Sequence, residues 1–178
     1  MSTTHPTTDY NPAIRHARLG RGQHRLETQT WFALPVAQVF PFFTDVENLE
    51  RITPPELGFR IVTPTPVEIE QGTLFEYRLR LWGVAFGWHS RISLWDPPHR
   101  FADEQLRGPY DTWFHEHVFE AEQGGTRMTD RVTYRLPGHP LAGPLLPLVR
   151  RQLERIFRFR AESIARLVVP SSGDRREL

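Results

Sequence analysis

The sequence predicts an α+β domain in which a curved antiparallel sheet wraps a long C-terminal helix. Three observations support this fold class: two short helical segments follow one strand, a long run of strand segments comes next, and an amphipathic helical pattern precedes the C-terminus. The strand segments are separated by Gly, Pro and Asp, which is typical of hairpins. We expect one domain over residues 23–168 with about seven strands, since a chain of 178 residues is large enough to bury its own core.

The first elements of this domain are a strand and two short helices. Residues 23–32 alternate as a strand, and residues 36–43 place apolar side chains at helical spacing behind Pro35. Asp45 is suited to cap a second short helix that ends near Ile52. Pro41 lacks an N–H, so we expect it to kink or shorten the first helix.

A hairpin is predicted at Trp82-Gly83, where the apolar residues change from odd to even positions. A two-residue turn there keeps both apolar sets on one face of the sheet. The resulting register pairs Leu81 with Val84, Leu79 with Phe86, and Tyr77 with Trp88. On the second strand, His89, Arg91 and Trp95 belong to the odd set, which this register places outside.

A second hairpin is predicted at Gln123-Gly124, after the stretch TWFHEHVFEA at residues 112–121. Side chains of a strand alternate between the two faces, so Trp113, His115, His117 and Phe119 share one side. The register places His117 opposite Asp130, His115 opposite Val132, and Trp113 opposite Tyr134, and it turns this side toward the interior.

A third hairpin joins residues 100–106 to this strand through residues 107–111, but its loop length is uncertain by one residue. Two alternatives therefore stay open: either Asp103 and Gln105 or Glu104 faces the interior. The last element is a long helix, whose buried stripe contains Val149, Leu153, Ile156 and Phe157. Its other faces carry arginines that are typical of a solvated cationic surface, namely Arg150, Arg151, Arg155, Arg158 and Arg166.

Three longer strings resemble a known superfamily: FTDVENLERITPPELGFRI, GTLFEYRLRLWGVAFGWHSRISLWDPPHRFADEQLRGPY and GGTRMTDRVTYRLP. They are similar to the START-like (SRPBCC, helix-grip) superfamily, and within it to the small bacterial ligand-binding proteins often labelled polyketide cyclase or dehydrase. The resemblance covers residues 23–168. It implies a deep cavity between sheet and C-terminal helix that holds a hydrophobic or amphipathic small molecule, such as a lipid or polyketide, and it implies no metal and no cofactor.

The polar residues predicted on the inward face also favour a cavity, since an unpaired buried polar group costs about 1–3 kcal/mol. We expect ligand binding by ten residues: Tyr77, Trp88, Ser90, Trp113, His115, His117, Met128, Asp130, Tyr134 and Ile156.

The cross-strand pair of His117 and Asp130 has two interpretations. The leading one is that it orients a bound ligand in a carrier or sensor. In the alternative, a polyketide cyclase/dehydratase-type enzyme, His117 and Asp130 are the catalytic acid/base pair that removes a proton next to a carbonyl, and Tyr134 or His115 stabilises the oxyanion. A third possibility is a metal-dependent enzyme, because two histidines and one carboxylate have the composition of a facial triad.

Composition limits the remaining classes. The chain has no cysteine, which excludes disulfides and thiolate chemistry, and its charges nearly balance, so a nucleic-acid partner is not expected. It offers neither a secretion signal nor an apolar run that could span a membrane, and we expect a cytoplasmic monomer or homodimer without integral membrane association. Residues 1–22 and 169–178 are expected to be a flexible arm and a flexible tail.

Overall fold

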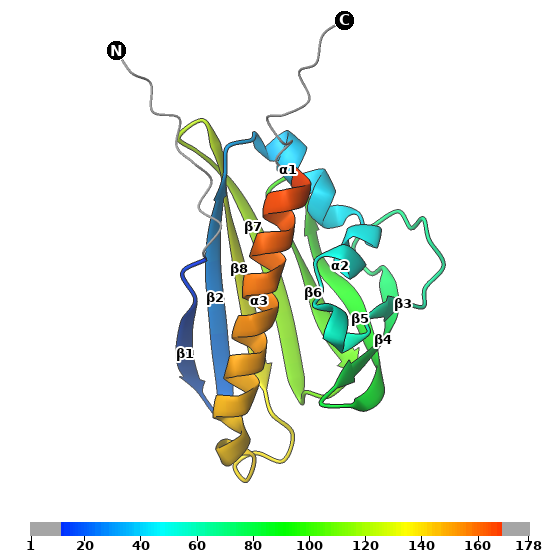
Figure 1. Ribbon diagram of the computed structural model, residues 1–178, viewed down its shortest axis with the longest axis vertical. Helices are drawn as coiled ribbons and strands as arrows, with labels where there is room; N and C mark the ends of the chain where they lie inside the picture. Colours follow the sequence, from blue (N-terminus) through cyan, green and yellow to red (C-terminus); the bar gives the residue numbers. More distant parts are fainter. Residues whose placement is uncertain (1–11, 169–178) are drawn as a thin grey trace, which may run out of the picture.

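The computed structural model describes residues 12–168. Figure 1 shows the arrangement of its elements. In chain order they are β1 (Arg15–Gly20), β2 (Gln23–Phe32), α1 (Val36–Thr44), α2 (Glu47–Arg51), the 3-10 turn η1 (Pro55–Leu57), β3 (Arg60–Ile61), β4 (Leu74–Leu81), β5 (Val84–Asp96), β6 (Arg100–Arg107), β7 (Thr112–Glu122), β8 (Gly125–Arg135), the 3-10 turn η2 (Gly143–Leu145) and α3 (Leu146–Val168).

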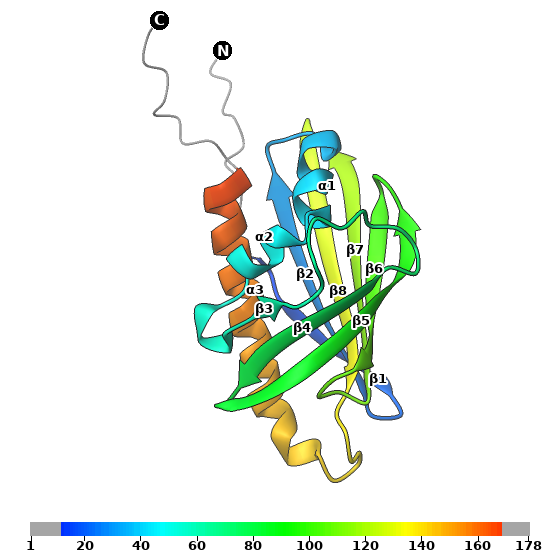
Figure 2. The ribbon, with the colours of Figure 1, turned by 90° about the vertical axis from the view of Figure 1, so that its right-hand side faces the viewer.

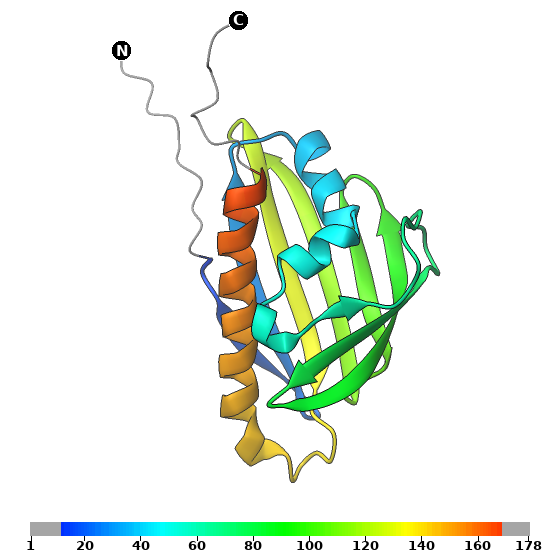
Figure 3. The ribbon, with the colours of Figure 1, turned by 45° about the vertical axis from the view of Figure 1, so that its right-hand side comes forward.

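The strands form a single antiparallel sheet in the order β1-β2-β8-β7-β6-β5-β4-β3. Strands β4 to β8 follow one another as a meander, and β2 pairs with β8 on the far side. The sheet is strongly curved, with β4 and β5 tilted across the other strands (Figure 2). Helix α3 runs along its concave side, next to α1 and α2 (Figure 3). The predicted α+β, helix-grip fold is confirmed.

Both predicted hairpin registers are confirmed. Leu81 pairs with Val84 across the β4–β5 turn, and His117 pairs with Asp130 across β7 and β8. Each turn has two central residues with positive φ, namely 50° and 82° in the first hairpin and 50° and 78° in the second. Two successive positive φ values are the mark of a type I′ turn, whose twist matches that of the strands it joins.

The N-terminal boundary and the strand number differ from the prediction. Residues 15–20, which were expected to lie in a flexible arm, form β1 and pair with β2 from Arg15↔Glu27 to Gly20↔Gln23. The sheet therefore has eight strands rather than about seven. Strand β1 lies at the sheet edge and is mostly exposed, so it is held mainly by main-chain hydrogen bonds to β2. Its sequence lacks the alternation of apolar and polar residues from which a strand is predicted. Residues 1–11 and the predicted tail, residues 169–178, lie outside the described residues.

A β-bulge in β5 changes the side on which Trp95 lies. The pairing with β6 shifts between Ile92 and Leu94, so that Trp95 comes opposite Phe101. Its indole packs in the core against Phe40, at 5.7 Å between ring centroids, rather than facing outward as predicted. An extra residue on one strand inverts the alternation beyond it, and a strict two-residue period cannot anticipate that change.

The two short helices are present, and α1 continues for three residues past Pro41. Pro41 lies inside a nine-residue helix, so the missing N–H removes one hydrogen bond shortly before the helix ends. Asp45 accepts a hydrogen bond from the backbone N–H of Glu47 at 3.0 Å and so supports the start of α2.

Three apolar clusters lie on the concave side of the sheet, and the smallest consists of Val46, Phe75 and Ile92. The other two are larger. One lies under α1 and contains Phe32, Phe40 and Phe119, and the other lies under α3 and contains Val132 and Leu153. No helix within residues 12–168 is long and apolar enough to cross a membrane.

Candidate functional site

A partly open pocket lies between the concave face of the sheet, α3 and the α1–α2 segment. The cavity volume is about 200 Å³, whereas a single water needs about 10–15 Å³. Most of the wall is apolar. Its aromatic and aliphatic members include Phe42, Phe43, Leu49, Ile52, Leu57, Phe59, Ile69, Phe75, Leu79, Leu81, Phe86, Ile92, Phe101, Leu153 and Phe157.

Six of the ten predicted ligand-binding residues line this pocket: Tyr77, Trp88, Trp113, His115, His117 and Ile156. The other four, Ser90, Met128, Asp130 and Tyr134, do not line it. All four are buried, as an inward direction requires, but they lie beneath other side chains. We therefore withdraw them as direct ligand contacts.

The physical reason for this difference is that the pocket occupies only part of the concave face. Met128 packs with Phe32 in the cluster under α1, and Tyr134 packs with Leu153 in the cluster under α3. The Tyr134 hydroxyl is therefore not available to stabilise an oxyanion in the pocket. A side chain on the inward face of the sheet is expected to be buried. Whether it also lines a cavity depends on where the helices cover the sheet.

Asp130 lies behind the two histidines and approaches both of them. Its Oδ1 atom is 2.9 Å from His115 Nε2, with hydrogen-bond geometry, and 2.7 Å from His117 Nδ1, where the angles are not those of a hydrogen bond. The imidazole rings lie 3.9 Å apart between centroids. The predicted cross-strand pair of Asp130 and His117 is present as the contact of 2.7 Å, and the hydrogen bond of Asp130 to His115 was not predicted.

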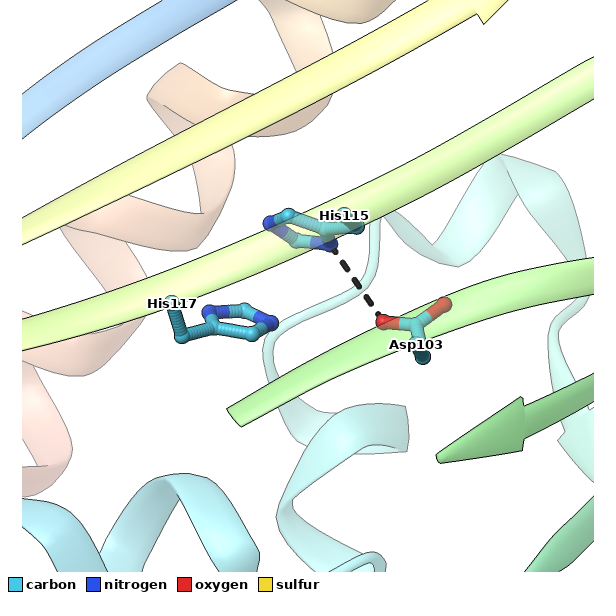
Figure 4. A group of neighbouring side chains, drawn as sticks. All are labelled: Asp103, His115 and His117. Carbon is cyan, nitrogen blue, oxygen red and sulfur yellow. Dashed lines mark ion pairs between the residues drawn. The ribbon is translucent and has the colours of Figure 1, made fainter. Parts of the chain in front are cut away.

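Asp103 is the site residue that the sequence left undecided. Strand β6 places it opposite His115, and its Oδ1 atom lies 3.7 Å from His115 Nδ1 on the pocket side of the ring (Figure 4). Glu104 points to the outer face and pairs with Arg91, and the Gln105 amide donates to the backbone of Tyr110. The length of the β6–β7 loop sets the register of the two strands, and the correct register would have identified Asp103 as the inward-facing residue. The sequence left that length uncertain by one residue.

The environments of the two carboxylates shift their pKa values in opposite directions. Burial raises the pKa of Asp103 to about 6, although the charges of His117 and Arg160 act against this rise. Burial would also raise the pKa of Asp130, but the positive charge that His117 carries when protonated and the hydrogen bond from His115 hold it below its usual range. Burial, and then the charge of His117, lower the pKa of His115 to about 3, so its ring is neutral at pH 7.

Aromatic contacts fix the orientation of the two imidazoles. Phe101 stacks on His117 at 4.3 Å and 22°, and Phe157 of α3 meets His115 edge-on at 5.6 Å. The guanidinium of Arg160 lies 5.2 Å above the Phe157 ring and lines the same pocket. The polar cluster is therefore held rigidly at one part of an otherwise apolar wall.

The sequence matches the family model described as "Polyketide cyclase / dehydrase and lipid transport" over residues 32–158. The chain belongs to this family. Membership supports binding of hydrophobic ligands in general. A search of curated protein sequences finds no significant match.

Solved structures share the fold with this member of the polyketide cyclase / dehydrase and lipid transport family. Protein Ms6760 from Mycobacterium smegmatis is 20% identical, with a TM-score of 0.64 over 91% of this chain and 98% of that one. TTHA0849 from Thermus thermophilus is 20% identical, with a TM-score of 0.63 over 81% and 96%. Ginseng major latex-like protein 151 from Panax ginseng is 13% identical, with a TM-score of 0.59 over 84% and 99%.

Proposed function

We propose that this protein binds a lipid- or polyketide-like small molecule as a carrier or sensor. The apolar body of the ligand lies among the aromatic side chains, and its polar group meets the cluster of Asp103, His115 and His117. The observation that carries this proposal is the composition of the pocket: a wall of mostly aromatic and aliphatic residues contains one rigid group of titratable side chains. This is the usual make-up of a small-molecule site, in which apolar surface supplies affinity and a few polar groups supply orientation.

The energetics favour an amphipathic ligand over a purely apolar one. Removal of apolar surface from water contributes about 2.5 kcal/mol to binding for roughly each 100 Å². A ligand without a polar group would displace water from Asp103 and His117 and leave them unpaired, which costs about 1–3 kcal/mol for each group. A hydroxyl or carbonyl at that end of the ligand removes this penalty.

Native mass spectrometry of the purified full chain, compared with the mass of the denatured chain, tests this proposal. We expect a bound species of low mass that is recovered in an organic extract and absent after denaturation. When the chain has been stripped of it, a long-chain hydroxy fatty acid should rebind with a stoichiometry of one. Failure of both the purified and the reloaded protein to carry any such mass would contradict the proposal.

A second candidate function is proton transfer, as in a polyketide cyclase/dehydratase-type enzyme. The environment of His115 favours it, because the imidazole lies between Asp130, with a lowered pKa, and Asp103, with a pKa of about 6. Carboxylates whose pKa values are separated in this way are a common basis for acid/base catalysis near neutral pH. Here Asp103 is the group that exchanges protons with a substrate, and Asp130 holds the ring of His115.

Deuterium exchange at the carbon next to a ketone carbonyl tests this second function. With 2-tetralone as the probe in D₂O, the protein should accelerate exchange with a pH dependence centred near the Asp103 pKa of about 6, and Asp103→Asn should abolish the acceleration. His89→Gln is the matched control, because His89 lies on the outer face of β5 beside Glu76. Equal rates for the native protein and Asp103→Asn would remove this candidate.

A further inference from the structure

Three potential metal ligands converge on the pocket from adjacent strands. The nearest ligand atoms of Asp103 on β6 and of His115 and His117 on β7 all lie within 4.8 Å of one another. Both histidine side chains are more than nine-tenths buried, and in Figure 4 each ring turns a nitrogen toward Asp103. Two imidazoles and one carboxylate are the donor set of many zinc and iron(II) sites that keep open coordination positions.

We propose that Asp103, His115 and His117 bind one divalent transition-metal ion, of the zinc or iron(II) class, in the wall of the pocket. This site goes beyond the proposed function, because it needs no hydrophobic ligand. It also revises the expectation of a metal-free pocket and changes the role of Asp130, which supports the histidines from behind.

The arrangement behind the histidines supports this inference. The hydrogen bond of 2.9 Å between His115 Nε2 and Asp130 leaves Nδ1, the nitrogen that faces Asp103, as the ligand atom of that ring. Asp130 also approaches Nδ1 of His117, so Nε2 is the nitrogen of that ring left for a ligand. A carboxylate that holds the far side of a histidine, fixing its tautomer and its orientation, is a recurrent feature of metal-binding histidines.

The separation of His115 and Asp103 suits a bridging cation better than a direct hydrogen bond. His115 Nδ1 and Asp103 Oδ1 face each other at 3.7 Å, which is too long for a direct hydrogen bond. Metal–ligand bonds of about 2.0–2.2 Å at tetrahedral angles require ligand atoms about 3.3–3.6 Å apart. The His115–Asp103 distance nearly meets this requirement, and a closure of about 1 Å brings the widest pair into the range of such bonds.

The charges around the site also favour a divalent cation. Two carboxylates, Asp103 and Asp130, lie on the sheet side, and the facing charge from α3 is Arg160. Arg160 opposes a cation, but its guanidinium lies over the Phe157 ring. A dication compensates the negative charges of both carboxylates. The coordination positions of the metal that the protein leaves open would face the apolar wall of the pocket.

Titration of the full chain with Co²⁺, and then competition with Zn²⁺, tests the site. The protein is prepared without an affinity tag and treated with a chelator. We expect one Co²⁺ per chain, with visible absorption bands of a nitrogen- and oxygen-coordinated ion and displacement by one equivalent of Zn²⁺. Co²⁺ affinity should fall roughly 100-fold or more in His117→Gln and Asp103→Asn, and about 10- to 100-fold in Asp130→Asn.

His89→Gln is the matched control, since it removes another histidine with a neighbouring carboxylate from the outer face of the sheet. Its affinity should be unchanged, and near-ultraviolet circular dichroism should show that the three site variants keep their tertiary structure. The proposal is overturned if the folded native chain binds neither Co²⁺ nor Zn²⁺ at a stoichiometry of one. It is also overturned if the folded Asp103→Asn and His117→Gln proteins bind as tightly as the native one. Both results are independent of retention of a hydrophobic ligand.

Discussion

Two aspartates at one site show how position alone gives the same side chain different properties. Asp130 accepts a hydrogen bond from His115 and lies close to His117, so its negative charge is compensated. Asp103 reaches the pocket, where its side chain is 24% exposed and no hydrogen-bond donor within the described residues stabilises its charge. The first carboxylate therefore contributes to stability, whereas the second is kept at a cost in stability, which is common at functional sites.

Asp103→Asn should stabilise the metal-free protein above pH 6. The pKa of Asp103 is about 6 in the folded chain and near 3.8 in the unfolded chain, so ionisation of the folded site costs free energy that reaches its full value above pH 6. Removal of the charge should raise the free energy of unfolding by about 1–3 kcal/mol at roughly pH 8 and by almost nothing at about pH 4. Urea unfolding of both proteins with a chelator present measures this difference, and an equal change at both pH values would refute the explanation.

Asp130→Asn should destabilise the protein, by about 1–3 kcal/mol at about pH 7, since it weakens a buried charge-assisted hydrogen bond. The pKa of Asp130 lies below its usual range, so its contribution is present above about pH 4 and disappears as the pH falls through the folded-state pKa. Thermal unfolding from about pH 7 down to about pH 2 should show a constant gap between the two proteins to about pH 4 and a narrowing gap below it. A gap that stays constant over this range would mean that the carboxylate charge is not the cause.

At the scale of elements, hairpin registers were the most predictable part of the structure. The apolar residues change from odd to even positions at Trp82-Gly83, and a second turn lies at Gln123-Gly124. Each turn sets the register of the strands that it joins, because a slip by one residue would turn the apolar side outward. The side of Trp95 and the pairing of β1 were not predictable by the same reasoning. The bulge in β5 interrupts the two-residue alternation of inward and outward side chains, and the exposed edge strand β1 shows no such alternation in its sequence.

The turn of the second hairpin offers a direct test at this scale. Gln123 adopts a φ of 50° at the first central position of a type I′ turn, where Asn is preferred over Gln. Gln123→Asn should therefore stabilise the protein by a few tenths to about 1 kcal/mol, whereas the β-branched Gln123→Val should destabilise it by a similar amount. Differential scanning calorimetry of both variants measures the effect. A lower melting temperature for Gln123→Asn would show that the turn does not limit stability.

At the scale of the whole molecule, the pocket depends on how the helices cover the sheet. The sequence predicted which side chains face inward, and the four buried residues that miss the pocket show where that prediction ends. Ser90, Met128, Asp130 and Tyr134 face the interior but lie beneath other side chains. The place of α3 along a curved sheet is set by many contacts at once, which no local pattern encodes.

The central claim, that the space beneath α3 holds a hydrophobic ligand, is tested most directly by filling that space. Ile156 on α3 lines the pocket, whereas Leu148 on the same helix is 47% exposed and lies outside the lining. Fluorescence titration with cis-parinaric acid should show binding to the native chain and to Leu148→Trp with equal affinity. Binding to Ile156→Trp should be roughly 10-fold weaker or more, while its melting temperature changes little. Equal affinity for all three folded proteins would contradict the claim.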